Sequence, residues 1–185
     1  SSIDVEAIDQ LKSFEATIKL NDSNRPRLKW DKVSNASKYE IHRSLLPDDL
    51  YDLRETTREG SYTDKSSLNG VDHYYRVVAL NSSGKAIAAS ELLQVKTKLG
   101  KEETVKTRYV NVHKINLYKV PDNGSRPVAL RYMDELKVGA AVVSRSKGSW
   151  YRAWYKDELL YLYVKKGEED KIAKEQSTFE YTGNT

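Results

Sequence analysis

The chain has no cysteine among its 185 residues. This absence excludes a thiol nucleophile, a zinc site with thiolate ligands and any disulfide. A small domain in an oxidising compartment often relies on disulfides. The fold must therefore be held by packing alone, whether the chain stays in the cell or is exported by a bacterium.

Long apolar runs and basic runs are also missing. No stretch is long and apolar enough to span a bilayer, so we expect no membrane insertion. The sequence has 31 Lys and Arg against 27 Asp and Glu, a formal net charge of +4, spread along the whole chain. A nucleic-acid-binding protein normally gathers positive charge on one face or helix. We therefore expect no nucleic-acid binding, although the sign of the charge fits weak attraction to an anionic cell wall.

Catalytic and metal-binding motifs are the third absence. His42, His73 and His113 lie in separate predicted strands without metal-ligand spacing. His42 lies between two inward positions and is expected to point to solvent. No Gly-x-Ser-x-Gly, phosphate-binding loop or dinucleotide motif occurs, and the many carboxylates have the pattern of solvated loop charge. We expect no enzymatic activity, no cofactor and no metal site.

What the chain does contain is a series of short alternating segments. Apolar and aromatic residues recur with the period of a β-strand over 27–30, 39–43 and 73–80. Turn-forming residues separate these segments at 21–24, 69–70 and 81–84. Short strands with turn signals roughly every 8–12 residues predict an all-β sandwich. Long helical periodicity is absent, which argues against a parallel α/β enzyme scaffold.

Composition divides the chain into five parts. Residues 1–12 form a lead segment with apolar residues at helical spacing, expected to be a short helix or the end of an upstream linker. Two strand-rich segments follow, at 13–97 and 104–166, separated by a polar linker at 98–103. Residues 167–185 are charged and then polar, as in a frayed helix or disordered tail. The start SSIDVEAIDQ has no signal-peptide pattern, and its abruptness favours a piece of a longer protein.

Residues 13–97 resemble fibronectin type III modules. The family places a core Trp before Asp-x-Val on its second strand, matched by Trp30, Asp31 and Val33. Its third and sixth strands have the patterns Tyr-x-Ile-x-Arg and Tyr-Arg-Val-x-Ala-x-Asn, matched at 39–43 and 75–81. The resemblance implies a β-sandwich with a long third-to-fifth-strand connection over 45–59 that carries a short extra strand. Bacterial modules of this family are mostly spacers or ligand platforms.

One position departs from that pattern. Three residues before Arg76 the family has a corner tyrosine, whose hydroxyl ties down the preceding loop, and this chain has His73. Either the register shifts by one residue to Tyr74, or an imidazole nitrogen of His73 makes the corner hydrogen bond. A lone histidine at such a position is more often structural than a ligand.

Residues 104–166 resemble bacterial Src-homology-3-like modules. The opening Leu-Asn-Val-Arg and its loop correspond to 115–127, and the hydrophobic strand with its diverging turn corresponds to 128–144. The signature Gly-x-Trp-Tyr-Lys-Val-x-Tyr corresponds to 148–155, whereas the closing Gly-Tyr-Val is replaced by Leu160, Tyr161 and Leu162. The resemblance implies a small β-barrel. Modules of this family often bind cell-wall peptidoglycan or its peptide bridges.

Strand alternation over 150–155 separates two faces. The resemblance implies that Tyr151, Ala153 and Tyr155 face the barrel interior, which leaves Trp150, Arg152 and Trp154 outside. Exposed aromatic rings usually mark interaction sites. Tyr118 is placed to join Trp150 in a groove for the flat face of a sugar or for an extended peptide. The alternative for Trp154 is packing against the sandwich or an upstream domain.

Three hypotheses for the function follow. The first is an accessory region of a secreted or surface bacterial protein, in which the sandwich is a spacer and the barrel binds a cell-wall glycan or peptide. Its ligand-binding residues would be Trp150, Tyr118, Arg152 and Trp154. The second is a scaffold that packs against an upstream catalytic domain of the same protein, for example a glycoside hydrolase, and has no ligand. The third, recognition of extended proline-rich peptides, rests on fold analogy alone.

Overall fold

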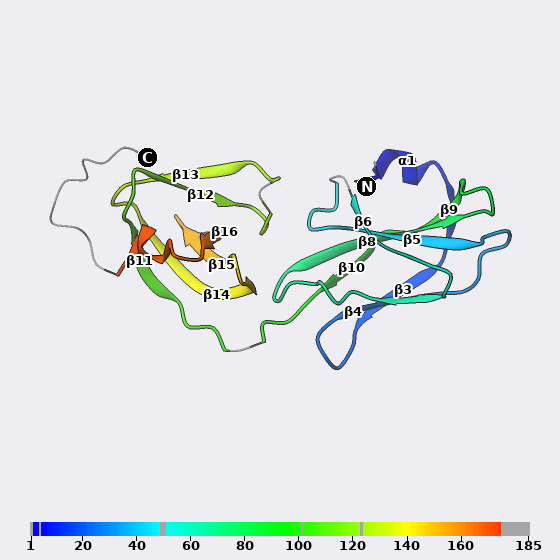
Figure 1. Ribbon diagram of the computed structural model, residues 1–185, viewed down its shortest axis with the longest axis horizontal. Helices are drawn as coiled ribbons and strands as arrows, with labels where there is room; N and C mark the ends of the chain where they lie inside the picture. The colour runs from blue at the N-terminus through cyan, green and yellow to red at the C-terminus, as the bar shows by residue number, and fades with distance from the viewer. Residues whose placement is uncertain (1, 4, 49–50, 101, 123, 175–185) are drawn as a thin grey trace. The chain divides into compact units, whose positions relative to one another are not determined.

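The computed structural model describes residues 2–3, 5–48, 51–100, 102–122 and 124–174 (Figure 1). Strands dominate this part of the chain, which contains one short α-helix and one 3-10 turn. The all-β fold class predicted from the sequence is confirmed. The chain divides into two compact units, Ser1–Lys98 and Leu99–Thr185.

The first unit consists of two packed sheets. In the described residues, the larger sheet has the order β1 (Ser2–Ile3), β6 (Tyr51–Thr57), β5 (Lys38–Ser44), β8 (Asp72–Leu80), β9 (Ala86–Ser90) and β2 (Lys12–Phe14). A further strand, β10 (Leu93–Lys96), also pairs with β8. The smaller sheet contains β3 (Ala16–Leu20), β4 (Pro26–Trp30) and β7 (Ser61–Thr63). Neighbouring strands are antiparallel except β2 and β9, which run parallel.

The core between the sheets comes from the alternation seen in the sequence. Leu28 and Trp30 of β4 face Tyr39 and Ile41 of β5, and all four side chains are buried. The Trp30 and Tyr39 rings meet edge-on, with centroids 5.3 Å apart, a favoured geometry for aromatic pairs. The expected extra strand in the 45–59 connection is β6, which pairs with β5.

Strand β8 is apolar on both faces, which explains its nearly continuous run of hydrophobic residues. One face contributes Val77 to the core between the sheets. On the other face, Val78 packs against Ile8 of helix α1 (Val5–Asp9). Figure 1 shows α1 on one side of the larger sheet and β3 and β4 on the other. Of the two interpretations of residues 1–12, the structure therefore shows the short helix.

The helix is also tied to the sheet by a buried cation. The Arg76 guanidinium, 9% exposed, donates hydrogen bonds to the Asp9 carboxylate at 2.8 Å and to the Ser90 carbonyl at 3.1 Å. His42 lies directly opposite Arg76 on the same face and is only 2% exposed. The prediction that His42 points to solvent is therefore wrong. Alternation correctly placed its side chain on the outer face, but the lead segment covers that face.

His73 takes the structural role at the corner. Its Nδ1 lies 2.9 Å from the Val71 carbonyl, and its Nε2 accepts a hydrogen bond from the Leu68 N–H at 3.1 Å. The side chain is fully buried, and burial lowers its pKa from 6.5 to about 4. The neutral imidazole thus holds the loop before β8. Of the two alternatives at this position, the bond through an imidazole nitrogen is the one observed.

The last residues of this unit are tied to two different loops. The Thr97 hydroxyl donates to the Leu68 carbonyl at 2.6 Å and accepts from the Val71 N–H at 3.1 Å. The Asn24 side chain, in the β3–β4 turn, bonds both the N–H and the carbonyl of Lys98, at 2.8 and 2.7 Å. The chain therefore leaves the sandwich with its backbone fixed through residue 98.

The second unit is one antiparallel sheet that curls strongly into a half-barrel (Figure 1). Its order in the described residues is β13 (Pro127–Arg131), β12 (Lys114–Tyr118), β16 (Glu158–Lys165), β15 (Gly148–Tyr155), β14 (Glu135–Arg145), β11 (Lys106–Val110) and β17 (Ile172–Ala173). Aliphatic side chains from six of these strands fill the concave side, Leu117, Leu130 and Leu160 among the fully buried ones.

Two details of this unit differ from the sequence expectation. The sheet continues past residue 166, because a 3-10 turn at Glu169–Lys171 leads into β17, which pairs with β11. The predicted tail thus begins as part of the sheet, and residues 175–185 lie outside the described part. The β15–β16 hairpin forms with Leu160 at the position where the resemblance led us to expect glycine, and Lys156 and Asp157 adopt φ of 50° and 64° in its turn.

Candidate functional site

Alternation along β15 sorts its side chains largely as predicted. Ala153 is fully buried in the half-barrel core, and Tyr155 packs against the same core. Tyr151 is half-buried. Trp150, Arg152 and Trp154 share the opposite, convex face of the sheet.

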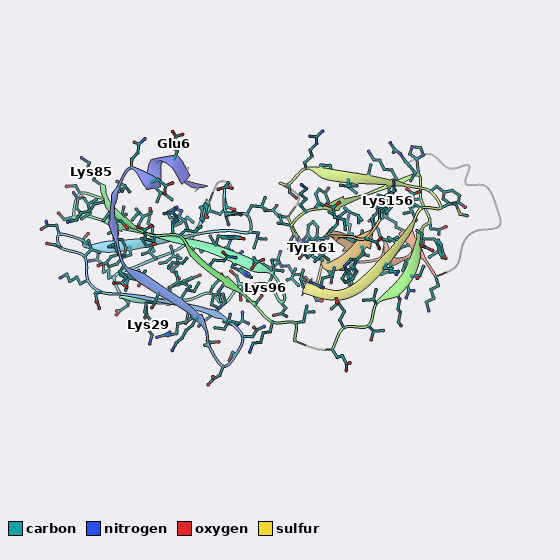
Figure 2. All side chains as sticks on the ribbon, turned by 180° about the vertical axis from the view of Figure 1, so that it is seen from behind. Glu6, Lys29, Lys85, Lys96, Lys156 and Tyr161 are labelled. Atoms are coloured by element: carbon teal, nitrogen blue, oxygen red, sulfur yellow. The ribbon has the colours of Figure 1, made fainter. Side chains whose placement is uncertain are left out.

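Trp150 is buried on that face, against the expectation of an exposed ring. It is 7% exposed because two tyrosines enclose it. The Tyr118 ring stands edge-on at 5.6 Å, and the Tyr163 ring is tilted at 5.2 Å. Tyr163 lies directly opposite Trp150 in the ladder, while Tyr118 pairs with Tyr161. Figure 2 labels Tyr161 within the second unit. We call Tyr118, Trp150 and Tyr163 the aromatic corner.

The aromatic corner combines a predicted pair with a residue that was missed. The sequence placed Tyr118 beside Trp150, and the structure brings these two rings together. Tyr163 was overlooked, although its alternation with Tyr161 in the run LYLYV was a visible signal. Tyr163 is 38% exposed and Tyr118 is half-buried. The corner therefore presents two phenol rings to solvent, with the indole as their support.

Arg152 and Trp154 belong to a separate cluster held by Glu103. The Glu103 carboxylate accepts hydrogen bonds from Arg152 Nε at 2.8 Å and from the Ala140 N–H at 2.9 Å. The guanidinium of Arg152 lies over the Trp154 ring, 5.1 Å from its centroid. We call Glu103, Arg152 and Trp154 the Glu103 clamp. These two predicted ligand residues already have partners within their own unit.

Gly139 is required by the Glu103 clamp. A Cβ at this position would lie 2.5 Å from the Glu103 carboxylate and 2.9 Å from the Trp154 ring. The pairing of β14 with β15 shifts register beside it, between Val138 and Ala141. Because Gly139 has no side chain and β14 is irregular here, the Glu103 carboxylate can approach the strand. Glu103 was assigned to the linker on composition, and nothing local in the sequence distinguishes it from an exposed linker charge.

A hollow opens beside the aromatic corner, where β12 and β16 diverge. These strands pair at Tyr118 and Tyr161, and the hollow next to this pair has a volume of about 330 Å³. Neighbouring residues of both strands contribute to its wall, together with the 3-10 turn that follows β16. The wall is formed by Lys114, Ile115, Asn116, Tyr118, Leu162, Tyr163, Val164, Lys165, Glu168, Lys171 and Ile172.

Positive charge dominates this hollow. Lys114, Lys165 and Lys171 are exposed, and Glu168 is the one acid in the wall. Lys171 bonds Glu168 at 2.8 Å and lowers the pKa of that carboxyl. We call this site the lysine hollow. It joins directly to the aromatic corner, since Tyr118 and Tyr163 line both.

Reactive constellations are not found in the part of the chain that the structure describes. No group of three or more His, Cys, Asp or Glu there could hold a metal ion. None of the described helices has the length and apolar character needed to cross a membrane. His73 and His42 are buried, and burial lowers the pKa of both imidazoles.

Comparisons with known proteins bear on the fold only. No protein-family model matches the chain, and a search of curated proteins finds no match. A solved structure described as an Fn3-like protein from Clostridium thermocellum aligns with half of this chain. The alignment covers 94% of that structure at 24% identity with a TM-score of 0.42.

Proposed function

We propose that the chain is a non-catalytic binding region of a larger secreted or surface bacterial protein. In this proposal a fibronectin type III-like sandwich acts as the spacer. A Src-homology-3-like half-barrel binds a cell-wall glycan or peptide at the aromatic corner. Membrane insertion, nucleic-acid binding and cofactors play no part in it.

The observation that carries this proposal is the continuity of the aromatic corner with the lysine hollow. Two phenol rings reach solvent at the edge of a concavity whose wall also has amide and ammonium groups. Binding sites typically combine apolar surface with a few convergent polar groups. Elsewhere on the convex face, Arg152 and Trp154 are engaged by Glu103. We therefore narrow the binding residues to Tyr118 and Tyr163, supported by Trp150.

Retention of the full chain on purified bacterial peptidoglycan sacculi with attached wall polymers tests the proposal. We expect Tyr163→Ala to reduce retention at least tenfold, because it removes the more exposed ring of the corner. Tyr109→Ala is the matched control, since Tyr109 lies on β11 outside the corner. Circular dichroism should show that both variants fold. Equal retention of the two variants, or no retention of the unaltered chain, would sink the proposal.

The scaffold hypothesis remains a second candidate because both tryptophans of the second unit already pack against side chains of that unit. Trp150 is enclosed by tyrosines, and Trp154 is stacked under Arg152. In this case the chain would fix the position of an upstream catalytic domain and would bind no polymer. Absence of wall binding by the unaltered chain, together with co-purification of that upstream domain when it is supplied separately, would favour the scaffold.

A further inference from the structure

We infer that the lysine hollow binds the acidic group of a sugar polymer while the aromatic corner contacts the adjoining sugar ring. This inference rests on the proposed function and specifies its ligand class. The shared chemistry is an anionic group, carboxylate or phosphate, repeated along a carbohydrate chain.

The positions of the cations support the anionic part. Lys114 and Asn116 alternate with Tyr118 along β12, so the three side chains share one face of that strand. Lys165 follows Tyr163 on β16 by the same two-residue step. Each strand therefore carries a tyrosine at the corner and a lysine further along the hollow. A ligand lying along the hollow would meet an apolar ring first and positive charge next.

The charge in the hollow is only partly neutralised from within, because Glu168 is one carboxylate among three lysines. Across the described residues of this unit, ion pairs join Arg152 to Glu103 and Lys171 to Glu168. The amines of Lys114 and Lys165 have no such carboxylate partner there. Lysines with like charge near one another raise the local potential, and an anionic ligand relieves it. A neutral ligand would make no favourable charge interaction with these lysines.

The geometry of the aromatic corner favours a sugar over a nucleic-acid base. Its rings meet at angles of 76° and 51°, so no two faces are parallel and separated as a clamp for a base. The phenol hydroxyls and the Asn116 amide can both donate and accept hydrogen bonds, which suits sugar hydroxyls. Duplex DNA offers phosphates to the lysines but keeps its bases stacked inside the helix, so it should bind more weakly than an acidic sugar polymer.

The experiment is a titration of the full chain with two acidic polymers, polygalacturonate and a poly(ribitol phosphate) teichoic acid. Chitotetraose and duplex DNA of equal charge serve as the neutral and non-sugar probes. The variant K114Q/K165Q removes the two unpaired cations. K106Q/K137Q is the matched control, since it removes the same charge from exposed lysines on β11 and β14. Tyr163→Ala is titrated in parallel.

We expect K114Q/K165Q to weaken binding of at least one acidic polymer fivefold or more, while K106Q/K137Q changes it less than twofold. Added salt should weaken binding of the unaltered chain and have less effect on K114Q/K165Q. The polymer that binds identifies the anion as carboxylate or phosphate. Equal effects of the two double variants, or equal affinity for DNA, would overturn the inference. Tyr163-dependent binding of chitotetraose alone would overturn it too, yet leave the proposed function standing.

Discussion

His73 illustrates how one buried imidazole can hold a loop through both of its nitrogens. An imidazole has a donor and an acceptor when neutral, and both are used here, toward Val71 and Leu68. A tyrosine hydroxyl could also hydrogen-bond this loop, through a single rotatable O–H group. The imidazole has a property that a tyrosine would lack, because its protonation removes the acceptor.

The first unit should therefore lose stability in mild acid. Burial lowers the pKa of His73 from 6.5 to about 4, and it also lowers the pKa of His42. The unfolded chain then takes up these protons first, so the stabilisation is complete above pH 6.5 and is lost as the pH falls toward 4. For His73 alone we expect a loss of about 3 kcal/mol between pH 7 and pH 4.

Urea unfolding of the first unit across this pH range measures the loss, and histidine NMR signals give the titration of each imidazole. His73→Gln should flatten the pH dependence, whereas His113→Gln should leave it unchanged because His113 belongs to the second unit. A His73 signal that titrates near pH 6.5 would contradict the argument.

Gly139→Ala tests the Glu103 clamp. The added methyl group would lie 2.5 Å from the Glu103 carboxylate, which is fixed by two hydrogen bonds and cannot withdraw freely. We expect the second unit to lose about 1–3 kcal/mol of unfolding free energy. Gly100→Ala is the control, since a methyl group there meets nothing within 4 Å. Equal stability of the two variants in denaturant melts would remove the proposed role of Gly139.

At the scale of elements, α1 is the part of the first unit that sequence patterns located but did not place. Periodicity in residues 1–12 left two alternatives, a short helix or the end of an upstream linker. Its docking on Val78 could not be deduced, because a helix of five residues has too little pattern to specify its partner. For the same reason, the burial of His42 on this face of the sheet could not be predicted. Strands β4, β5 and β8 were predictable because alternation and flanking turns are local signals.

Ile8→Ala should show how much α1 contributes to the first unit. Ile8 is 1% exposed against Val78, Leu80 and Ala89. We expect a loss of about 2–4 kcal/mol from the removed apolar contacts and the remaining cavity. Leu92→Ala, at an exposed leucine of the same unit, should cost less than about 1 kcal/mol. Thermal melts that shift equally in both variants would show that the helix is not part of the cooperative fold.

The β15–β16 hairpin offers a stabilising change. Asp157 occupies the left-handed region at φ 64°, where a side chain costs energy and glycine does not. Asp157→Gly should raise the unfolding free energy of the second unit by about 0.5–1 kcal/mol. Glu158→Gly, one residue into β16, should lower it, because glycine weakens an extended strand. A calorimetric midpoint that falls in Asp157→Gly would contradict this reasoning.

The candidate site shows a similar division between local and long-range information. Tyr118, Trp150 and the two faces of β15 followed from spacing along the chain. The burial of Trp150 depends on Tyr163, and that contact requires the register of β15 against β16. The Glu103–Arg152 bond spans 49 residues. Spacing identifies which residues share a face of a strand, but cross-strand register decides which of them meet solvent.

For the whole molecule, the division into two compact units predicts separable unfolding. Each unit has its own buried cluster, one around Ile41 and Val77 and the other around Leu117 and Leu160. Ile41→Ala should lower the calorimetric midpoint of the first unit only, and Leu160→Ala that of the second unit only. We expect each substitution to cost about 2–5 kcal/mol of unfolding free energy in its own unit. A single transition that shifts as a whole in both variants would show one cooperative unit instead.

The exit of the chain from the sandwich has a mechanical consequence. Thr97 is bonded to the loop before β8 of the larger sheet, and Lys98 is bonded to the β3–β4 turn of the smaller one. A pull applied at residue 99 would therefore load both layers together before it could peel β10 from β8. Under tension along the chain, the bonds of Thr97 and Lys98 would share the force between the two sheets.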